Sequence, residues 1–181
     1  MGYNIARVMM HIRIGEYIIR DWAPSDEAAL VKYADNRKIW LNLDDRFPHP
    51  YTAADAREWI SLASKEPVTN FAIATAYEAI GGVGLRLLEG LFRNSAELGY
   101  WLAEPYWGKG IATAAVPAMV DFGFRELNLV RLQALVFARN TASAHVLEKC
   151  GFKLEGRLVK GIYKDGENID GLIYARLRDV V

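Results

Sequence analysis

Residues 100–112 read YWLAEPYWGKGIA and combine three local signals in one short segment. An apolar stretch typical of a strand ends before Pro105, two glycines follow at positions 108 and 110, and a helical pattern comes next. The first turn of a helix offers free N–H groups and the positive end of the helix dipole, and glycines let an anion approach the backbone. The segment matches neither the P-loop nor the Rossmann pattern of glycines. It therefore predicts a phosphate or pyrophosphate site or, equally from spacing alone, a plain strand-to-helix turn.

Residues 140–152, NTASAHVLEKCGF, form the second informative segment. Asn140 is a typical helix N-cap, Ser143 falls on the first turn of the helix, and Gly151 is typical of the residue just past a helix end. The pattern predicts a helix over residues 141–150. Simple capping explains Asn140 and Ser143 when this segment is taken alone.

The remaining pattern alternates irregularly between strands and helices. Strands are predicted over residues 12–22, 70–75, 81–88, 95–103 and 132–138, with a terminal hairpin in 158–177 that turns at 164–166. Helices are predicted from Pro24, over 52–65 with Thr52 as its cap, and over 108–126, and residues 38–51 read as an irregular loop. Because strands and helices do not alternate strictly, the pattern favours the α/β class with a mixed sheet covered by helices, in one domain spanning residues 1–181.

Composition excludes several classes of function. The 181 residues carry 22 Lys and Arg against 22 Asp and Glu, and this zero net charge argues against nucleic acid as a partner. The single cysteine, Cys150, excludes a disulfide within the chain, and the three histidines lack metal-ligand spacing, so no metal is expected. No apolar stretch reaches the roughly 18 residues of a membrane span, and we expect a cytoplasmic protein.

The two glycine-containing segments together resemble a known superfamily. WGKGIA at 107–112, followed about 28 residues later by N-x-x-S-x-x-x-x-E-K-x-G-F, is similar to the Gcn5-related N-acetyltransferase (GNAT) superfamily and its RimJ/RimL-like branch. IIRDWAPSDEAAL at 18–30, AELGYWL at 96–102 and DGLIYARL at 170–177 match the same branch, so the resemblance covers nearly the whole chain. It implies a mostly antiparallel seven-stranded sheet with helices on both faces and splayed fourth and fifth strands. It also implies an acetyl-CoA-dependent N-acetyltransferase in which a primary amine attacks the thioester directly.

The resemblance assigns the coenzyme contacts to three short stretches. The pyrophosphate loop falls on Trp107, Gly108, Lys109, Gly110, Ile111 and Ala112. Tyr100, Trp101 and Leu102, at the end of the fourth strand, are expected to pair with the pantetheine amides, and Asn140 and Ser143 to line the other side of the coenzyme arm.

Two positions depart from the superfamily pattern. Many members have a tyrosine four residues before the Gly-Phe pair that protonates the leaving thiolate, and this chain has Leu147 there. Ser143 is the remaining hydroxyl nearby and is expected to take this role. RimL-like members have a glutamate before the aromatic residue of the sixth strand, where this chain has Ile162. Glu97 is then the candidate general base, and a structural ion pair with a basic neighbour such as Arg93 is the alternative.

The acceptor side is expected in residues 38–51, with Trp40, Asn42, Arg46, Phe47 and Tyr51 as its wall. The acceptor stays open between a protein or peptide N-terminus and a small amine such as a polyamine, an amino acid or an antibiotic. The expected partners are acetyl-CoA and that amine, without nucleic acid or membrane, and a homodimer is one of the oligomeric states left open. A non-catalytic acyl-CoA-binding or sensing domain is the alternative function, which the replacements at positions 147 and 162 favour slightly.

Overall fold

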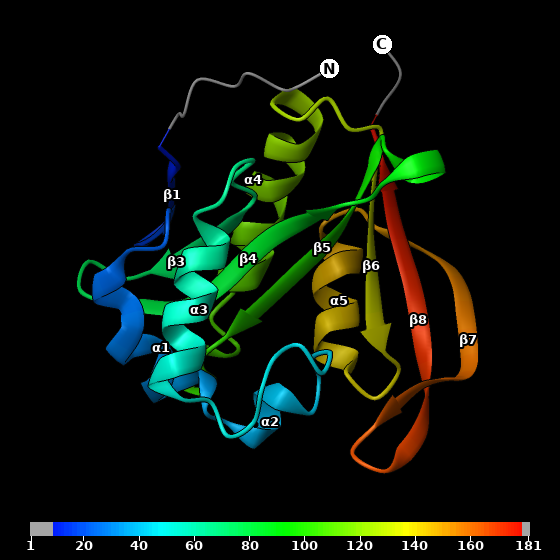
Figure 1. The fold of residues 1–181 in the computed structure, drawn as a ribbon. Helices are drawn as coiled ribbons and strands as arrows, with labels where there is room; N and C mark the ends of the chain where they lie inside the picture. The colour runs from blue at the N-terminus through cyan, green and yellow to red at the C-terminus, as the bar shows by residue number, and fades with distance from the viewer. Residues whose placement is uncertain (1–8, 179–181) are drawn as a thin grey trace.

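The computed structural model describes residues 9–178 and shows one sheet with helices on both faces (Figure 1). The strands are β1 (His11–Ile14), β2 (Tyr17–Arg20), β3 (Asn70–Ala74), β4 (Ala79–Leu87), β5 (Ser95–Leu102), β6 (Arg131–Phe137), β7 (Lys153–Lys164) and β8 (Glu167–Leu177). The helices are α1 (Glu27–Ala34), α2 (Arg37–Trp40), α3 (Ala53–Ala63), α4 (Ile111–Arg125) and α5 (Thr141–Lys149). Three short 3-10 turns, η1 (Pro24–Asp26), η2 (Gly90–Phe92) and η3 (Glu104–Tyr106), lie between them. None of these described helices is long and apolar enough to cross a membrane.

The sheet has eight strands in the order β1-β2-β3-β4-β5-β6-β8-β7. Every neighbouring pair is antiparallel except β5 and β6, which run parallel. The predicted mixed, mostly antiparallel sheet is therefore confirmed.

The predicted number of seven strands is wrong, because the apolar stretch over residues 12–22 is a hairpin and not one strand. His11–Ile14 pairs with Tyr17–Arg20, and the chain reverses at Gly15 and Glu16. Gly15 has φ +66°, a left-handed conformation that glycine adopts at little cost. A single glycine inside an Ile- and Tyr-rich stretch was the signal for this turn.

The predicted splay of the fourth and fifth strands falls on β5 and β6. Their pairing ends at Glu97 and Gln133, while β5 continues to Leu102 and β6 to Phe137. The two strands diverge beyond this point, with α5 lying near the opening (Figure 1). The parallel pair has no short connection, since α4 joins the two strands. The splay is therefore confirmed, and it opens the sheet between two segments that carry predicted site residues.

Local capping signals were predicted well. The Thr52 hydroxyl accepts a hydrogen bond from the N–H of Asp55 at 3.3 Å, and the Asn140 side chain accepts one from the N–H of Ser143 at 3.1 Å. The predicted loop over residues 38–51 needs correction at its start, where α2 forms. Asn36 caps that short helix by accepting from the N–H of Lys38 at 2.9 Å, which explains why a helical turn forms there.

The helices divide the core into two layers. α4 and α5 pack their apolar residues on one face of the sheet, and α1 and α3 cover the other face. α4 contains Pro117, which cannot donate the usual bond to the Thr113 carbonyl. The buried thiol of Cys150 lies 3.6 Å from that carbonyl oxygen and donates to it, so the C-cap residue of α5 partly replaces the missing bond.

Candidate active site

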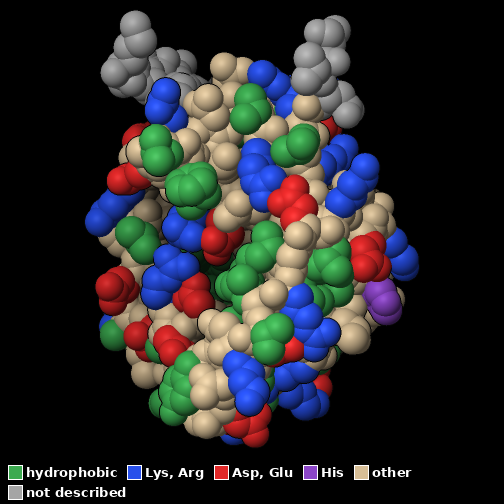
Figure 2. Space-filling model, turned by 90° about the vertical axis from the view of Figure 1, so that its right-hand side faces the viewer, with side chains coloured by type: hydrophobic (Ala, Val, Ile, Leu, Met, Phe, Trp, Pro, Cys, Tyr) green, Lys and Arg blue, Asp and Glu red, His purple; other side chains and the backbone are tan. Residues whose placement is uncertain are grey.

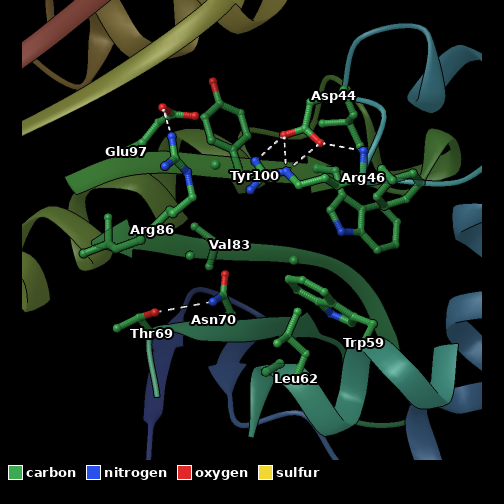
Figure 3. Close-up of a pocket in the computed structure, with 18 of the residues that line it drawn as sticks. Asp44, Arg46, Trp59, Leu62, Thr69, Asn70, Val83, Arg86, Glu97 and Tyr100 are labelled. Carbon is green, nitrogen blue, oxygen red and sulfur yellow. Dashed lines mark hydrogen bonds and ion pairs between the residues drawn. The ribbon is translucent and has the colours of Figure 1, made fainter. Parts of the chain in front are cut away.

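A cavity of about 940 Å³ lies on the α3 side of the sheet, over β3, β4 and β5. Figure 3 shows ion pairs along its β4–β5 side and Trp59 and Leu62 of α3 opposite them. The segment between α2 and α3 forms the remaining wall. The cavity therefore lies between strands β3, β4 and β5 on one side and α3 with the segment before it on the other.

An aromatic cluster forms part of the cavity wall. The ring of Phe47 lies 5.1 Å from that of Tyr51 and 5.7 Å from that of Trp101, measured between centroids. Tyr51 is buried, and this burial raises the pKa of its hydroxyl above the usual value. The hydroxyl therefore stays protonated, and the cluster offers apolar surface with one neutral polar group.

Charged side chains line the same cavity. Arg46 binds Asp44 with an N–O distance of 2.5 Å, and Arg86 binds Glu97 at the same distance. The Arg46 guanidinium holds the pKa of the Asp44 carboxyl below its usual range. Five carboxylates line the cavity against three cationic groups: Asp44, Asp55, Glu58, Glu89 and Glu97 against Arg46, Lys65 and Arg86. The cavity thus has an acidic excess, although acidic and basic side chains are interspersed on the outer surface (Figure 2).

The five residues expected to form the acceptor wall do not all lie at this cavity. Arg46, Phe47 and Tyr51 line the cavity. Asn42 does not, because its side chain donates to the Lys38 carbonyl at 2.9 Å. Trp40 also lies elsewhere, where its ring covers the ammonium group of Lys164 at 3.8 Å. Both exceptions belong to α2 or the turn after it, and the helical geometry of that stretch directs these side chains away from the cavity.

Glu97 lies at the last pair of β5 and β6, on the cavity side of the sheet. Its cross-strand neighbour on β4 is Arg86, which forms the ion pair described above. The expected basic partner, Arg93, instead donates to the Gly90 carbonyl at 3.2 Å. Glu97 remains partly exposed and retains a second carboxylate oxygen outside this ion pair.

A pair of hydroxyl groups lies at the split, where Tyr100, one of the residues that line the cavity, reaches α5. The Tyr100 hydroxyl lies 2.8 Å from Ser143 Oγ, in hydrogen-bond contact, and joins β5 to the first turn of α5. Burial raises the pKa of Tyr100 to about 12. Leu147, on the next turn of α5, is fully buried in the core. Tyr100 was expected to contribute only its backbone, and no sequence signal places its hydroxyl beside a residue 43 positions later.

The edge of β5 beyond the split has free backbone groups. The Ser95 carbonyl and the Ala103 N–H both bond to the β4 side. Backbone groups alternate in direction along a strand, so the N–H and carbonyl groups of Tyr100 and Leu102 point away from β4, toward the opening. The indole N–H of Trp107 donates to the Leu102 carbonyl at 2.6 Å. Trp101 faces β4 with its backbone and contacts Phe47 with its ring, which places it on the cavity side.

The glycine segment forms a turn at the start of α4. Gly108 has φ +73° and Gly110, the N-cap residue, has φ +75°. The space that a Cβ on either glycine would occupy has no heavy atom within 4 Å. Lys109 directs its ammonium group toward the Tyr106 ring at 5.1 Å, and Ile111 is buried in the core. An open left-handed turn before free helix N–H groups fits a pyrophosphate, since the backbone amides can donate to it without side-chain obstruction.

A mixed sheet that opens between its parallel strands, with an open glycine turn at one end of the opening and a charged cavity beside it, is the arrangement of the GNAT class of fold. The family model described as "Acetyltransferase (GNAT) domain" matches residues 17–153, and the chain belongs to this family.

Two curated relatives illustrate the similarity in sequence. YoaA, an uncharacterized N-acetyltransferase of Bacillus subtilis (strain 168), is 37% identical over 98 residues, which are 54% of this chain and 55% of that protein. YokL, an SPbeta prophage-derived uncharacterized N-acetyltransferase of the same organism, is 31% identical over 144 residues, 78% of this chain and 80% of that protein. The chain spans about half the length of several curated relatives that it matches.

Two solved structures illustrate the similarity in fold. Mycobacterium smegmatis RimJ in complex with CoA-disulfide has a TM-score of 0.77 and 27% identity, covering 93% of this chain and 85% of that one. Spermidine N-acetyltransferase from Vibrio cholerae in complex with CoA and spermine has a TM-score of 0.75 and 25% identity, covering 90% and 95%. The RimJ neighbour agrees with the resemblance to the RimJ/RimL-like branch.

Proposed function

We propose that this protein is an acetyl-CoA-dependent N-acetyltransferase that moves an acetyl group to a primary amine. The observation that carries the proposal is the opening between β5 and β6 beyond Glu97 and Gln133. The glycine turn lies at one end of this opening and the charged cavity lies beside it, and Tyr100, whose hydroxyl contacts Ser143, also lines the cavity. Two reactants can therefore meet at one point, as direct transfer requires.

On the coenzyme side, the N–H groups of Gly108, Gly110, Ile111 and Ala112 would hold the pyrophosphate. The backbone N–H of Tyr100 points into the opening and can donate to the thioester carbonyl oxygen, which gains negative charge during attack. The backbone of Leu102 lies farther along the same edge of β5. Trp107 stabilises the loop through its bond to Leu102. Asn140 positions the start of α5 and, with it, the side chain of Ser143.

Ser143 is the proton donor for the departing sulfur in this proposal. Its hydroxyl gives a proton to the thiolate as the C–N bond forms and the C–S bond breaks, and solvent reprotonates it. In this proposal Tyr100 acts through Ser143 as a positioning residue: of the two hydroxyls in contact, that of Tyr100 is the donor, so that the Ser143 proton is free for the sulfur. A pKa of about 12 keeps Tyr100 protonated at neutral pH, as this role requires.

On the acceptor side, the acidic excess of the cavity favours a cationic molecule that presents a primary amine. The ammonium group must lose a proton before attack, and Glu97 is the proposed acceptor of that proton through its unpaired carboxylate oxygen. The ion pair with Arg86 opposes this role, because it stabilises the charged carboxylate. The neighbour in complex with CoA and spermine, and a second neighbour named ribosomal-protein-S5-alanine acetyltransferase from Vibrio fischeri, support an amine acceptor of either the small or the peptide kind.

Turnover of acetyl-CoA against a panel of polyamines, amino acids and peptides tests the proposal, with release of free thiol as the measurement. Thiol release that depends on one class of amine supports it. Measurable coenzyme affinity without thiol release for any amine would favour the alternative, a non-catalytic acyl-CoA-binding domain.

A further inference from the structure

Lys164, at the tip of the β7–β8 hairpin, has a side chain that is only 1% exposed. Among residues 9–178 it is the largest side chain that is fully buried. Its ammonium nitrogen lies 2.7 Å from Asp45 Oδ1 and 3.8 Å from the centroid of the Trp40 ring. Burying a lysine is costly unless its charge is compensated, and here one carboxylate and one aromatic face provide that compensation.

The partner of Lys164 belongs to the segment that walls the cavity. We define the acceptor loop as residues 41–51, which lie between α2 and α3. Asp45 lies between Asp44 and Arg46, and both of these neighbours line the cavity, as Phe47 and Tyr51 do. Lys164 thus holds the acceptor loop from outside the cavity, through a contact between residues 119 positions apart.

Two other contacts tie the same region to the C-terminal third of the chain. Arg37 binds Asp165 with an N–O distance of 2.5 Å, and Arg139 donates to the Leu41 carbonyl at 2.6 Å. The Arg37–Asp165 pair is exposed on both sides, and exposed pairs contribute little to stability. Lys164 is therefore the buried anchor, and the two arginines are secondary contacts.

We propose that Lys164 is a positioning residue that fixes the acceptor loop and so determines which amines the cavity accepts. The proposal rests on the transferase function proposed above. Lys164 contacts neither the glycine turn nor the Tyr100–Ser143 pair, so its effect falls on the acceptor and not on the coenzyme. Lys164, at the tip of the β7–β8 hairpin, thus contributes to the amine specificity of a cavity whose lining residues lie far from it in the sequence.

Lys164→Met tests the proposal with little risk to folding. Methionine keeps the apolar stem against Trp40 and removes a charge that is costly to bury. Asp45 is 73% exposed, so water solvates its carboxylate when the partner is lost. Asp45→Asn, at this exposed position, removes the ion pair from the other side. Lys153→Met is the matched control, an exposed lysine at the opposite end of the same strand.

Steady-state kinetics with a small and a larger acceptor amine provide the first measurement. Both test variants should raise the acceptor KM by about tenfold, equal to about 1.4 kcal/mol, and shift the ratio of kcat/KM between the two amines. The KM for acetyl-CoA should stay within about twofold, and Lys153→Met should match the wild type. An unchanged acceptor KM, or an equal rise in both KM values, would overturn the proposal.

Limited trypsin digestion provides a measurement that needs no activity. Cleavage after Arg46, inside the acceptor loop, should be faster in Lys164→Met and Asp45→Asn than in the wild type and the control. Unchanged cleavage would show that the loop does not depend on Lys164, and would also overturn the proposal. A wild-type protein that acetylates no amine would instead contradict the proposed function, while the digestion would still report on the anchor.

Discussion

The hydrogen bond between the hydroxyls of Tyr100 and Ser143 joins β5 to the first turn of α5, beside the opening of the sheet. Many members of the superfamily protonate the leaving thiolate with a tyrosine at the position of Leu147. This chain lacks that hydroxyl, and Leu147 is fully buried in the core. In the proposed mechanism the Tyr100–Ser143 pair takes over this proton transfer, with one hydroxyl from a strand and one from a helix. Its two members are expected to act as one unit.

Replacing either hydroxyl should lower kcat more than it weakens coenzyme binding. We expect Ser143→Ala to reduce kcat by about a hundredfold, the low end for general acid catalysis, and Tyr100→Phe to reduce it less. The double variant should be no slower than Ser143→Ala, because Tyr100 acts only through Ser143. Kinetics with Tyr163→Phe, an exposed tyrosine, as control check this. Loss of affinity with kcat intact would reduce Ser143 to a coenzyme contact.

Glu97 is the second residue with a testable role, that of general base, and the pH dependence of kcat/KM tests it. If it takes the proton of the amine, Glu97→Gln should keep coenzyme binding and flatten the acid limb of the kcat/KM profile, because no carboxylate remains to lose its proton as the pH rises. If the amine loses its proton before binding, the acid limb should persist in the variant and follow the pKa of the acceptor. Profiles for two amines of different basicity, in both proteins, separate these outcomes.

At the scale of secondary structure, the start of α4 is the element on which the proposed coenzyme binding depends. The helix begins after Gly110, which has a left-handed backbone and open space on its side-chain face. The β1–β2 turn has the same properties at Gly15, with φ +66° and no neighbouring atom within 4 Å. The two glycines share their backbone geometry but differ in their surroundings, which makes one a control for the other.

Gly110→Ala and Gly15→Ala should each lower stability by about 1 kcal/mol, since both place a Cβ on a left-handed residue. Only Gly110→Ala should weaken acetyl-CoA binding, by about tenfold or more, because only there does the methyl group enter the space proposed for the pyrophosphate. Thermal unfolding and calorimetric titration of both variants measure the two effects. Equal coenzyme affinity in the two variants would remove the assignment of the phosphate loop.

At the scale of the whole molecule, the proposed function requires two reagents to meet at one opening in the sheet. The acidic excess belongs to the cavity, whereas the whole chain has no net charge. Long-range steering of a cationic acceptor is therefore weak, and its attraction to the cavity is local.

Salt should weaken acceptor binding in proportion to acceptor charge. Raising the ionic strength from about 0.05 M to about 0.5 M should increase the KM of a dicationic amine more than that of a monocationic amine. The reason is that Glu58 and Glu89 line the cavity without a basic partner among the ion pairs of residues 9–178. Initial rates at saturating acetyl-CoA measure the effect. Equal salt dependence for the two amines would argue against an acidic acceptor cavity.

Features that depend on neighbouring residues in the chain were predicted from the sequence. A few adjacent residues with distinct backbone preferences determine each of three features: the cap at Asn140, the glycine turn before α4 and the hairpin turn that follows Lys164. The mixed sheet and its split also agree with the prediction, which rested on the resemblance to the superfamily. The main local error was the hairpin at Gly15, where one glycine outweighs an otherwise continuous strand pattern.

The tertiary structure alone decided which side chains meet. Arg86 lies beside Glu97 because β4 and β5 pair in one register, and a shift of one residue would have directed these side chains to opposite faces. Tyr100 meets Ser143, and Lys164 meets Asp45, only after α5 and the hairpin pack against the rest of the molecule. Local backbone preferences depend on a few adjacent residues, so they can be predicted from the sequence. These contacts join positions up to 119 residues apart and arise only from packing.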